Sequence, residues 1–265
     1  MYGLTCCRAE PFAAAKKIVA KSNQEAPFTA TALTTAIEVL EGSPYLRTDR
    51  LISIPLLALV YGWSADELAP EIDELIGTGC TTLKVKVGFD VDTDLEHVRL
   101  IQRLVAGRAR LRIDANQSYG RDEACRFARS LDPEGIELIE QTCTVGDWDA
   151  ALAVAEVAEV PLMLDESIYD LSDVDKAAEL GVASYVKFKL MKAGGLESLA
   201  QALAHIRRCG MEPVLGNGVA CDVGSWMEVC MVPSHHQCRG DEWVSQDQPT
   251  ASRASPCRRA TCNQA

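Results

Sequence analysis

Three apolar runs in this sequence each end on an acidic side chain, and these acids could do chemistry together. They are Asp114 after residues 111–113, Glu140 after residues 136–139, and Asp165 after residues 161–164. Three carboxylates held close together repel one another strongly unless a cation neutralises them. Oxygen ligands that leave room for water suit Mg²⁺, and no histidine or cysteine cluster accompanies the acids, which argues against Zn²⁺. The pattern therefore predicts a Mg²⁺ site; the alternative is that these acids are solvated loop residues.

Two pairs of lysines lie on the apolar runs that flank the acids. Lys84 and Lys86 are separated by one residue, as are Lys187 and Lys189, so each pair lies on one side of its strand. A lysine inside a barrel is costly unless it pairs with an acid or loses its proton. A neighbouring positive charge lowers the pKa of a lysine, which would suit a general base. We predict that Lys86 and Lys189 carry the proton chemistry, whereas Lys84 and Lys187 could instead serve only in salt bridges.

A metal ion that binds a substrate carboxylate, with a lysine on each face, points to one kind of reaction. The substrate would lose the proton α to its carboxylate, and the metal would stabilise the enediolate that forms. Two bases allow the proton to leave one face and return on the other, which gives racemisation or epimerisation. One base and a leaving group would give elimination or cycloisomerisation.

The elements that must hold these side chains alternate between strands and helices. We expect strands at residues 51–60, 81–88, 110–115, 136–140, 161–165, 184–190 and 212–216, with helices at 65–77, 94–105, 121–130, 147–158, 172–180, 196–208 and 224–231. Near-continuous apolar strands that alternate with helices indicate a parallel sheet covered on both faces. Eight such units close a (β/α)₈ barrel, in which the carboxyl ends of the strands face one mouth. An open doubly wound sheet is the alternative, but it places its site at one or two strand ends, whereas charges end five successive strands here.

The sequence divides into three regions. We expect residues 51–232 to form an α/β domain, an incomplete (β/α)₈-type TIM barrel with about seven strand–helix units. Residues 1–50 are rich in alanine and other helix formers, and helices are expected near 13–20 and 30–40. Residues 233–265 are rich in Ser, Gln, Arg and Cys, so we expect an irregular or disordered tail that supplies no eighth strand.

Composition limits the class of protein. The 265 residues are 48% hydrophobic and 24% charged, which is typical of a globular protein. A net charge of −12 argues against nucleic acid or an anionic membrane as a partner. The sequence shows neither the apolar run of a membrane span nor the pattern of a signal peptide. The eleven cysteines have no C-x-x-C spacing, so we expect a cytoplasmic protein with reduced thiols at Cys80, Cys125, Cys143 and Cys209.

Five motifs in this order resemble the enolase superfamily, and within it the mandelate racemase/muconate lactonizing enzyme family. They are Lys84-Val85-Lys86, Asp114-Ala115-Asn116, Glu140, Asp165-Glu166-Ser167 and Lys189-Leu190-Met191-Lys192-Ala193-Gly194-Gly195. The muconate lactonizing (muconate cycloisomerase) subgroup is the most similar, and the resemblance covers roughly residues 30–232. It implies a Mg²⁺-dependent isomerase or lyase that acts on a small-molecule carboxylate such as an amino-acid derivative, a dipeptide or a cyclic acid. It also implies a homo-oligomer.

The resemblance assigns three Mg²⁺ ligands, two acid/base residues and two substrate-binding residues. These are, in that order, Asp114, Glu140 and Asp165; Lys86 and Lys189; and Lys84 and Asn116. Lys84 would contact the substrate carboxylate and lower the pKa of Lys86.

Several features leave alternatives open. The mandelate racemase subgroup uses a histidine base late in the barrel, but the four histidines lie on expected helices or in the tail, so that subgroup is disfavoured. Lys189-Leu190-Met191-Lys192 also resembles dipeptide epimerases. Gly216-Asn217-Gly218 could instead grip a phosphate, which would indicate a metal-free phosphate enzyme.

Two departures from the family pattern concern the ends of the barrel region. Family members begin with an α+β capping domain that closes the mouth, and residues 10–45 would be its helical remnant. We hypothesise that the reading frame is shifted near residue 233, so that the tail would be translated out of frame. The alternative functions are therefore a catalytically inactive barrel fragment and a dehydratase of the same superfamily.

Overall fold

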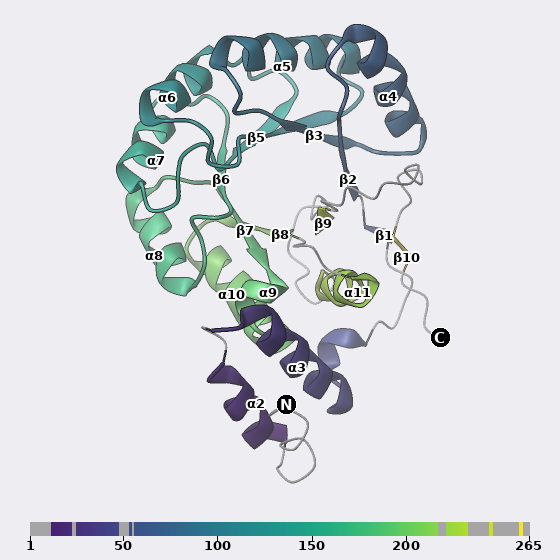
Figure 1. Cartoon of the computed structure of the whole chain (residues 1–265), viewed down its shortest axis with the longest axis vertical. Coiled ribbons are helices and arrows are strands. Elements are labelled where there is room, and N and C mark those ends of the chain that lie inside the picture. The colour runs from purple at the N-terminus through teal and green to yellow at the C-terminus, as the bar shows by residue number, and fades with distance from the viewer. Residues whose placement is uncertain are drawn as a thin grey trace.

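The computed structural model describes residues 12–22, 25–47, 53–54, 56–216, 221–232, 244–245 and 260–261. Its centre is a closed ring of parallel strands that follow one another in chain order (Figure 1). These strands are β2 (Leu56–Leu59), β3 (Thr82–Lys86), β4 (Arg110–Asp114), β5 (Ile136–Glu140), β6 (Leu162–Leu164), β7 (Tyr185–Lys189), β8 (Glu212–Gly216) and β9 (Val244–Ser245). Because all of them are parallel, their carboxyl ends lie at the same mouth of the barrel.

Strands β2 to β8 make up nearly all of the ring, and the predicted class of incomplete TIM barrel with seven strand–helix units is confirmed. One expectation about the ring was wrong. Residues after Val232 do supply an eighth strand, because β9 pairs with Leu56 and Leu57 of β2 and with Gly216 of β8. Strand pairing uses backbone N–H and C=O groups, so two residues can occupy this position without a long aliphatic run.

Helices surround the ring on its outer side (Figure 1). They are α4 (Ala65–Gly77), α5 (Val91–Val105), α6 (Arg121–Ser130), α7 (Trp148–Ala155), α8 (Leu171–Leu180), α10 (Leu196–Arg208) and α11 (Asp222–Met231). A single-turn helix, α9 (Leu190–Ala193), is inserted between β7 and α10. The expected strand at residues 51–60 divides in two: β2 joins the barrel, whereas β1 (Ser53–Ile54) pairs antiparallel with β10 (Ala260–Thr261).

Side-chain caps fix where two of these helices begin. The Ser64 side chain accepts a hydrogen bond from the N–H of Glu67, whose carboxylate accepts one from the N–H of Ser64, at the start of α4. Asp90 accepts a hydrogen bond from the N–H of Thr93, which explains why α5 begins at Val91 rather than near residue 94. Each such cap contributes about 1 kcal/mol to stability.

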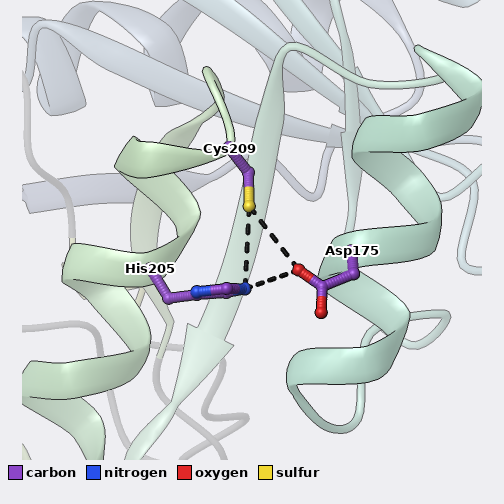
Figure 2. Close-up of side chains that lie close together, drawn as sticks. All are labelled: Asp175, His205 and Cys209. Carbon is purple, nitrogen blue, oxygen red and sulfur yellow. Dashed lines mark hydrogen bonds and ion pairs between the residues drawn. The ribbon is translucent and has the colours of Figure 1, made fainter.

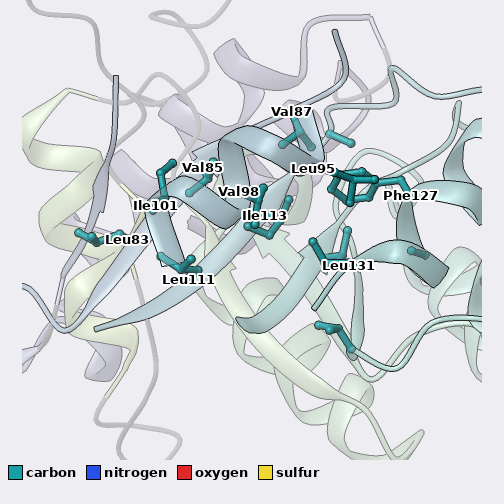
Figure 3. Close-up of a cluster of buried hydrophobic side chains, with 14 of the residues drawn as sticks. Leu83, Val85, Val87, Leu95, Val98, Ile101, Leu111, Ile113, Phe127 and Leu131 are labelled. Carbon is teal, nitrogen blue, oxygen red and sulfur yellow. The ribbon is translucent and has the colours of Figure 1, made fainter. Parts of the chain in front are cut away.

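The apolar core formed by residues 60–162 lies between the strands and the outer helices (Figure 3). It includes Leu83 and Val85 of β3, Leu111 and Ile113 of β4, and Leu95, Val98 and Ile101 of α5. Successive side chains of a strand point to opposite faces, so the residues between these apolar ones point into the barrel. The helices are therefore held by one face of the strands, and the other face is left for the site.

The interior of the barrel contains a small apolar layer below a charged one. Leu138, Met163 and Val214 form the apolar cluster, and each is almost completely buried. Glu140 follows Leu138 by two residues on β5, so it points to the same side one layer nearer the mouth. Glu140 therefore lies nearer the mouth than this apolar cluster.

Helices α2 (Phe12–Ala20) and α3 (Pro27–Leu40) precede the barrel, and α3 is joined to it through a buried carboxylate. Glu38 is 3% exposed, and its two oxygens accept hydrogen bonds from the N–H groups of Leu196 (2.8 Å) and Glu197 (3.1 Å). The N-cap of α10 is Gly195, and a Cβ atom there would lie 2.9 Å from Cγ2 of Thr34. Glu38 therefore supplies the cap that Gly195 lacks, and it fixes α3 against the start of α10.

The cysteines only partly follow the sequence-based expectation. Cys125, Cys143 and Cys209 are free thiols, as expected, but Cys80 is disulfide-bonded. A disulfide requires two Cα atoms to come within about 7 Å, which spacing along the sequence does not reveal. In the part of the chain that the structure describes, no helix has the length and apolar character needed to cross a membrane.

Candidate active site

The three acids predicted at the mouth lie on adjacent strands and are almost completely buried. Asp114 ends β4, Glu140 ends β5, and Asp165 follows β6 directly. Their exposed fractions are 0%, 1% and 3%. Asp114 is the register partner of Glu140, so the two carboxylates enter the barrel side by side.

Buried lysines lie between these carboxylates. Nζ of Lys84 is 2.7 Å from Oδ2 of Asp114 and 3.0 Å from Oε2 of Glu140. Nζ of Lys187 is 2.8 Å from Oε1 of Glu140 and 3.7 Å from Oδ2 of Asp165. The side chains thus alternate in charge, and each ammonium group compensates the two acids beside it.

The two lysines predicted to carry the proton chemistry lie at the ends of this charged series. Nζ of Lys86 is 2.6 Å from Oδ2 of Asp114, and Nζ of Lys189 is 2.8 Å from Oδ2 of Asp165. Their side chains are 32% and 13% exposed, whereas those of Lys84 and Lys187 are at most 2% exposed. The outer lysines can therefore be approached from the mouth, but the inner ones cannot.

The paired charges shift the pKa values of the groups at the mouth. Burial opposes ionisation of Glu140, yet Lys187 and Lys84 together hold its pKa well below the usual range. Burial also opposes ionisation of Asp165, and Lys187 again outweighs it, so the pKa of Asp165 is lowered. Burial alone would lower the pKa of Lys189, but the Asp165 carboxylate overcomes this and raises it. In this ion-paired arrangement Lys189 is a proton donor.

The donor set at the mouth fits Mg²⁺ in its chemistry, because all three ligand candidates are buried carboxylates. The ammonium groups of Lys84 and Lys187 lie between these acids, however. Among described residues, Asp114, Glu140 and Asp165 are not a group of three whose ligand oxygens all lie within 4.8 Å of one another. One ion bound by all three would therefore require the ammonium groups of Lys84 and Lys187 to withdraw from between them.

The side chain of Asn116 joins the Lys86 end of the series to Glu166. Its Oδ1 accepts a hydrogen bond from Nζ of Lys86 (2.6 Å), and its Nδ2 donates one to Oε1 of Glu166 (3.2 Å). Asn116 has φ 43°, and its neighbour Gln117 has φ 68°. Non-glycine residues in this left-handed region are uncommon and are concentrated at functional sites. Asn116, predicted to bind substrate, is therefore in direct contact with one of the two outer lysines.

Gln141 holds the backbone that carries Asp165, although no motif marks it in the sequence. It is 2% exposed and has φ 40°. Its Oε1 accepts hydrogen bonds from the N–H groups of Asp165 (3.0 Å) and Ser167 (3.1 Å), and its Nε2 donates to the Cys143 carbonyl (2.9 Å) and to Oγ of Ser167 (2.7 Å). Both groups of the Gln141 side-chain amide thus bind the segments that follow β5 and β6.

Lys192 also contacts Asp165, through both the side chain and the backbone carbonyl of Asp165. Its Nζ donates hydrogen bonds to Oδ1 of Asp165 (3.0 Å) and to the carbonyls of Asp165 (2.7 Å) and Ile168 (2.8 Å). Burial lowers the pKa of Lys192, although Asp165 opposes the shift. The Lys-x-Gly-Gly sequence places Lys192 near the mouth, but only the fold shows that it contacts an acid there.

Glu228 of α11 is a second residue that the sequence does not mark. It is 2% exposed, lines an apolar cavity of about 670 Å³, and has an Oε2 atom without a hydrogen-bond partner. The cavity lies among α3, α9 and α11 and is lined largely by apolar groups, including those of Phe28, Val39, Leu190, Met191 and Met227. Burial raises the pKa of Glu228 to about 8, although the Leu190 N–H and Lys189 oppose the shift.

The fold and the strand-end residues agree with a match to a known family. The model of the family described as "Enolase C-terminal domain-like" matches residues 67–256, and the chain belongs to this family. The match includes Asp114, Glu140 and Asp165 and the four lysines that lie beside them.

Relatives with assigned activities include the L-Ala-D/L-Glu epimerase of Bacillus subtilis (strain 168), which is 30% identical over 68% of this chain and 48% of its own length. Muconate cycloisomerase from Pseudomonas fluorescens superposes with a TM-score of 0.71 at 23% identity over 83% of this chain and 64% of its own. A dipeptide epimerase from Cytophaga hutchinsonii, solved with Mg and the dipeptide D-Ala-L-Val, has a TM-score of 0.71 at 19% identity, covering 82% and 60%. The chain spans about half the length of the curated relatives it matches.

Proposed function

We propose that this chain carries out Mg²⁺-dependent abstraction of the proton α to a substrate carboxylate, giving racemisation, epimerisation or cycloisomerisation. The observation that carries the proposal is the placement of Lys86 and Lys189 at opposite ends of the buried acid series. One contacts Asp114 and the other contacts Asp165, with Glu140 between those acids. A planar carboxylate substrate over Glu140 would then have one ammonium or amine group on each face.

The proton chemistry follows from that placement. A neutral Lys86 or Lys189 accepts the α-proton on Nζ, and the electron pair of the broken C–H bond moves toward the substrate carboxylate. The opposite lysine, as an ammonium ion, then donates a proton to the same carbon from the other face. The configuration at carbon is inverted, and the two lysines exchange protonation states. Mg²⁺, when held by Asp114, Glu140 and Asp165, supplies positive charge beside the substrate carboxylate.

The inner lysines have a different part in the proposal. Lys84 and Lys187 are buried and paired, so they cannot reach a substrate carbon without leaving their acids. Lys84 lies two residues before Lys86 on β3, and its ammonium group lies between Asp114 and Glu140. Lys187 compensates Glu140 and Asp165 and must yield that position when a metal ion binds.

The substrate class that we propose is a dipeptide or an N-acylated amino acid. The names of the relatives support it, since several are dipeptide epimerases or N-succinyl amino acid racemases. A cyclic acid handled by a cycloisomerase is the second candidate, and the likeness in fold to muconate cycloisomerase supports it.

The proposal is tested by proton exchange. The purified chain is incubated in D₂O with Mg²⁺ and L-Ala-L-Glu, N-succinyl amino acids or muconolactone, and deuterium at the α-carbon is followed by NMR. Exchange is expected with at least one of these acids and should fall roughly 10²- to 10⁴-fold in Lys86→Ala or Lys189→Ala. Lys17→Ala, a change at an exposed lysine of α2, is the matched control. Exchange that persists in both site variants would refute the assignment.

A catalytically silent barrel is the second candidate, and the compensated acid series favours it. If Lys84 and Lys187 hold their positions permanently, the acids need no metal. Such a protein would show no exchange with any of the acids above, and Mg²⁺ would not raise its melting temperature.

A further inference from the structure

A second group of potential metal ligands lies far from the mouth, on the outer helices (Figure 2). Asp175 is on α8, His205 is on α10, and Cys209 is the C-cap residue of α10. Within the described part of the chain, this is the one set of three acidic, histidine or cysteine side chains whose ligand atoms all lie within 4.8 Å of one another. Cys209 is three residues before β8, so the group lies at the end of the barrel opposite the mouth.

The three potential ligand atoms, Nε2 of His205, Oδ1 of Asp175 and Sγ of Cys209, are all in mutual contact, as Figure 2 shows. Nε2 of His205 is 2.6 Å from Oδ1 of Asp175, Sγ of Cys209 is 3.6 Å from the same Nε2, and Sγ is 3.7 Å from the same Oδ1. The His205 and Cys209 side chains are four residues apart on one helix and therefore lie on one face of it. The Asp175 side chain comes from the neighbouring helix to meet them.

This geometry excludes a thiol–imidazole–carboxylate relay. In such a relay the carboxylate holds one ring nitrogen while the nucleophile faces the other. Here Asp175 and Cys209 both face Nε2. The other nitrogen, Nδ1, lies 3.2 Å from Nη2 of Arg208, which can only donate, so Nδ1 accepts and the proton lies on Nε2. Convergence of three donor atoms on one point is the arrangement that a metal ion requires.

We propose that Asp175, His205 and Cys209 bind a Zn²⁺ ion that ties α8 to α10, with a fourth position open to water. Zn²⁺ takes thiolate, imidazole and carboxylate ligands together, whereas Mg²⁺ does not accept a thiolate. Tetrahedral Zn²⁺ with the usual bond lengths separates such ligand atoms by roughly 3.3–3.6 Å. The two distances to Sγ already match, and only the Asp175–His205 contact must open.

The Asp175–His205 contact can open because the Asp175 and Arg208 side chains are both exposed to solvent. The Asp175 side chain is 61% exposed, so it can rotate away from Nε2 without disturbing the core. Arg208 is exposed and can leave Nδ1, which then takes the ring proton as Nε2 binds the metal. The thiol proton of Cys209 is released to solvent when the thiolate binds.

The test uses Co²⁺ and Zn²⁺ on the chelator-treated full chain, in which Cys209 is a free thiol. Co²⁺ is expected to give the charge-transfer absorption of a cobalt–thiolate bond, Zn²⁺ is expected to remove it, and Zn²⁺ is expected to raise the melting temperature. Cys209→Ser, His205→Gln and Asp175→Ala should each weaken binding about tenfold or more, since even losing an outer partner of a ligand has that effect. Far-UV circular dichroism checks that each variant is folded.

The control is chosen because the chain contains eleven cysteines. Cys125→Ser changes another free, half-buried thiol, on α6, and should leave the Co²⁺ spectrum and the Zn²⁺ effect intact. Mg²⁺ titrations should be the same in Cys209→Ser and in the unaltered chain, which separates this site from the mouth. Unchanged Co²⁺ and Zn²⁺ binding in any one of the three ligand variants would overturn the three-ligand site.

Discussion

Nζ of Lys187 lies 2.8 Å from Oε1 of Glu140, and both side chains are 2% exposed. The lysine also reaches Asp165 at 3.7 Å, so one buried ammonium group compensates two acids that are candidates for metal binding. A charge attached to the chain in this way competes with any free cation for the same carboxylates. The balance between the two determines whether the mouth is a metal site.

Replacing Lys187 with Met is therefore expected to strengthen Mg²⁺ binding and to destabilise the metal-free protein. Removal of one partner from a buried ion pair costs roughly 3–5 kcal/mol, because the remaining charge is uncompensated. Mg²⁺ can restore that compensation, so the increase in melting temperature on Mg²⁺ addition should be larger in the variant. Thermal unfolding across a Mg²⁺ titration measures both effects. Lys17→Met is the control, and equal Mg²⁺ responses in Lys187→Met and the unaltered chain would contradict the prediction.

Gln141→Ala should destabilise the protein by roughly 2–4 kcal/mol, because the buried N–H groups of Asp165 and Ser167 lose their acceptor. Urea unfolding measures the loss. Gln201→Ala removes an exposed amide from α10 and should change stability by less than about 0.5 kcal/mol. If Gln141→Ala lowers the free energy of unfolding no more than Gln201→Ala does, the Gln141 amide does not stabilise the segments that carry Asp165 and Ser167.

Glu228→Gln should alter how stability depends on pH. Glu228 has a pKa of about 8 in the folded state, against 4.5 for a glutamate fully exposed to water, so the folded state keeps a proton that the unfolded chain releases. Stability from this proton is fully present below pH 4.5 and is lost progressively as the pH rises to about 8. The variant has no such proton, so its stability relative to the unaltered chain should increase by a few kcal/mol over that interval. Chemical unfolding at several pH values checks this, and a constant difference across the interval would rule it out.

Glu38→Ala should loosen the start of α10. The N–H groups of Leu196 and Glu197 would lose their acceptor, at a cost of about 1–2 kcal/mol, which is typical of a lost N-cap. Amide hydrogen exchange at these two residues should become faster, while exchange in α5 should not change. Glu25→Ala, at an exposed acid just before α3, is the control. Unaltered exchange at Leu196 and Glu197 in the Glu38 variant would show that α10 does not depend on this cap.

Much of the fold could be predicted because the alternation of residues along a strand shows which side of the sheet each side chain faces. An acid that ends an apolar run, such as Asp114 or Glu140, must lie at the mouth once the sheet is parallel. A spacing of two residues likewise put Lys187 and Lys189 on the same side of β7. The seven principal strands and their helices followed from the same signals. The eighth strand did not, since Val244 and Ser245 pair only through their backbone.

The remaining features depend on contacts between residues far apart in the sequence. Periodicity places Lys187 inside the barrel, but it does not show which acids its ammonium group will meet. Glu38 caps a helix that begins 158 residues later, and neither segment carries a cue for the other. Gln141 and Glu228 resemble ordinary polar residues of a loop and a helix until the fold buries them. The Asp175–His205 contact also joins two helices whose relation is fixed only by the ring.

Gly216 connects two of these features. A Cβ atom there would lie 2.7 Å from Cγ of Lys187 and 2.8 Å from its Cε, so the lysine fits only because this position has no side chain. The same residue is the one in β8 that pairs with Ser245 and completes the ring. An added methyl group at Gly216 would therefore displace the side chain that places an ammonium group between Glu140 and Asp165. The charge arrangement at the barrel mouth thus depends on a glycine in the same strand that pairs with β9 to close the ring.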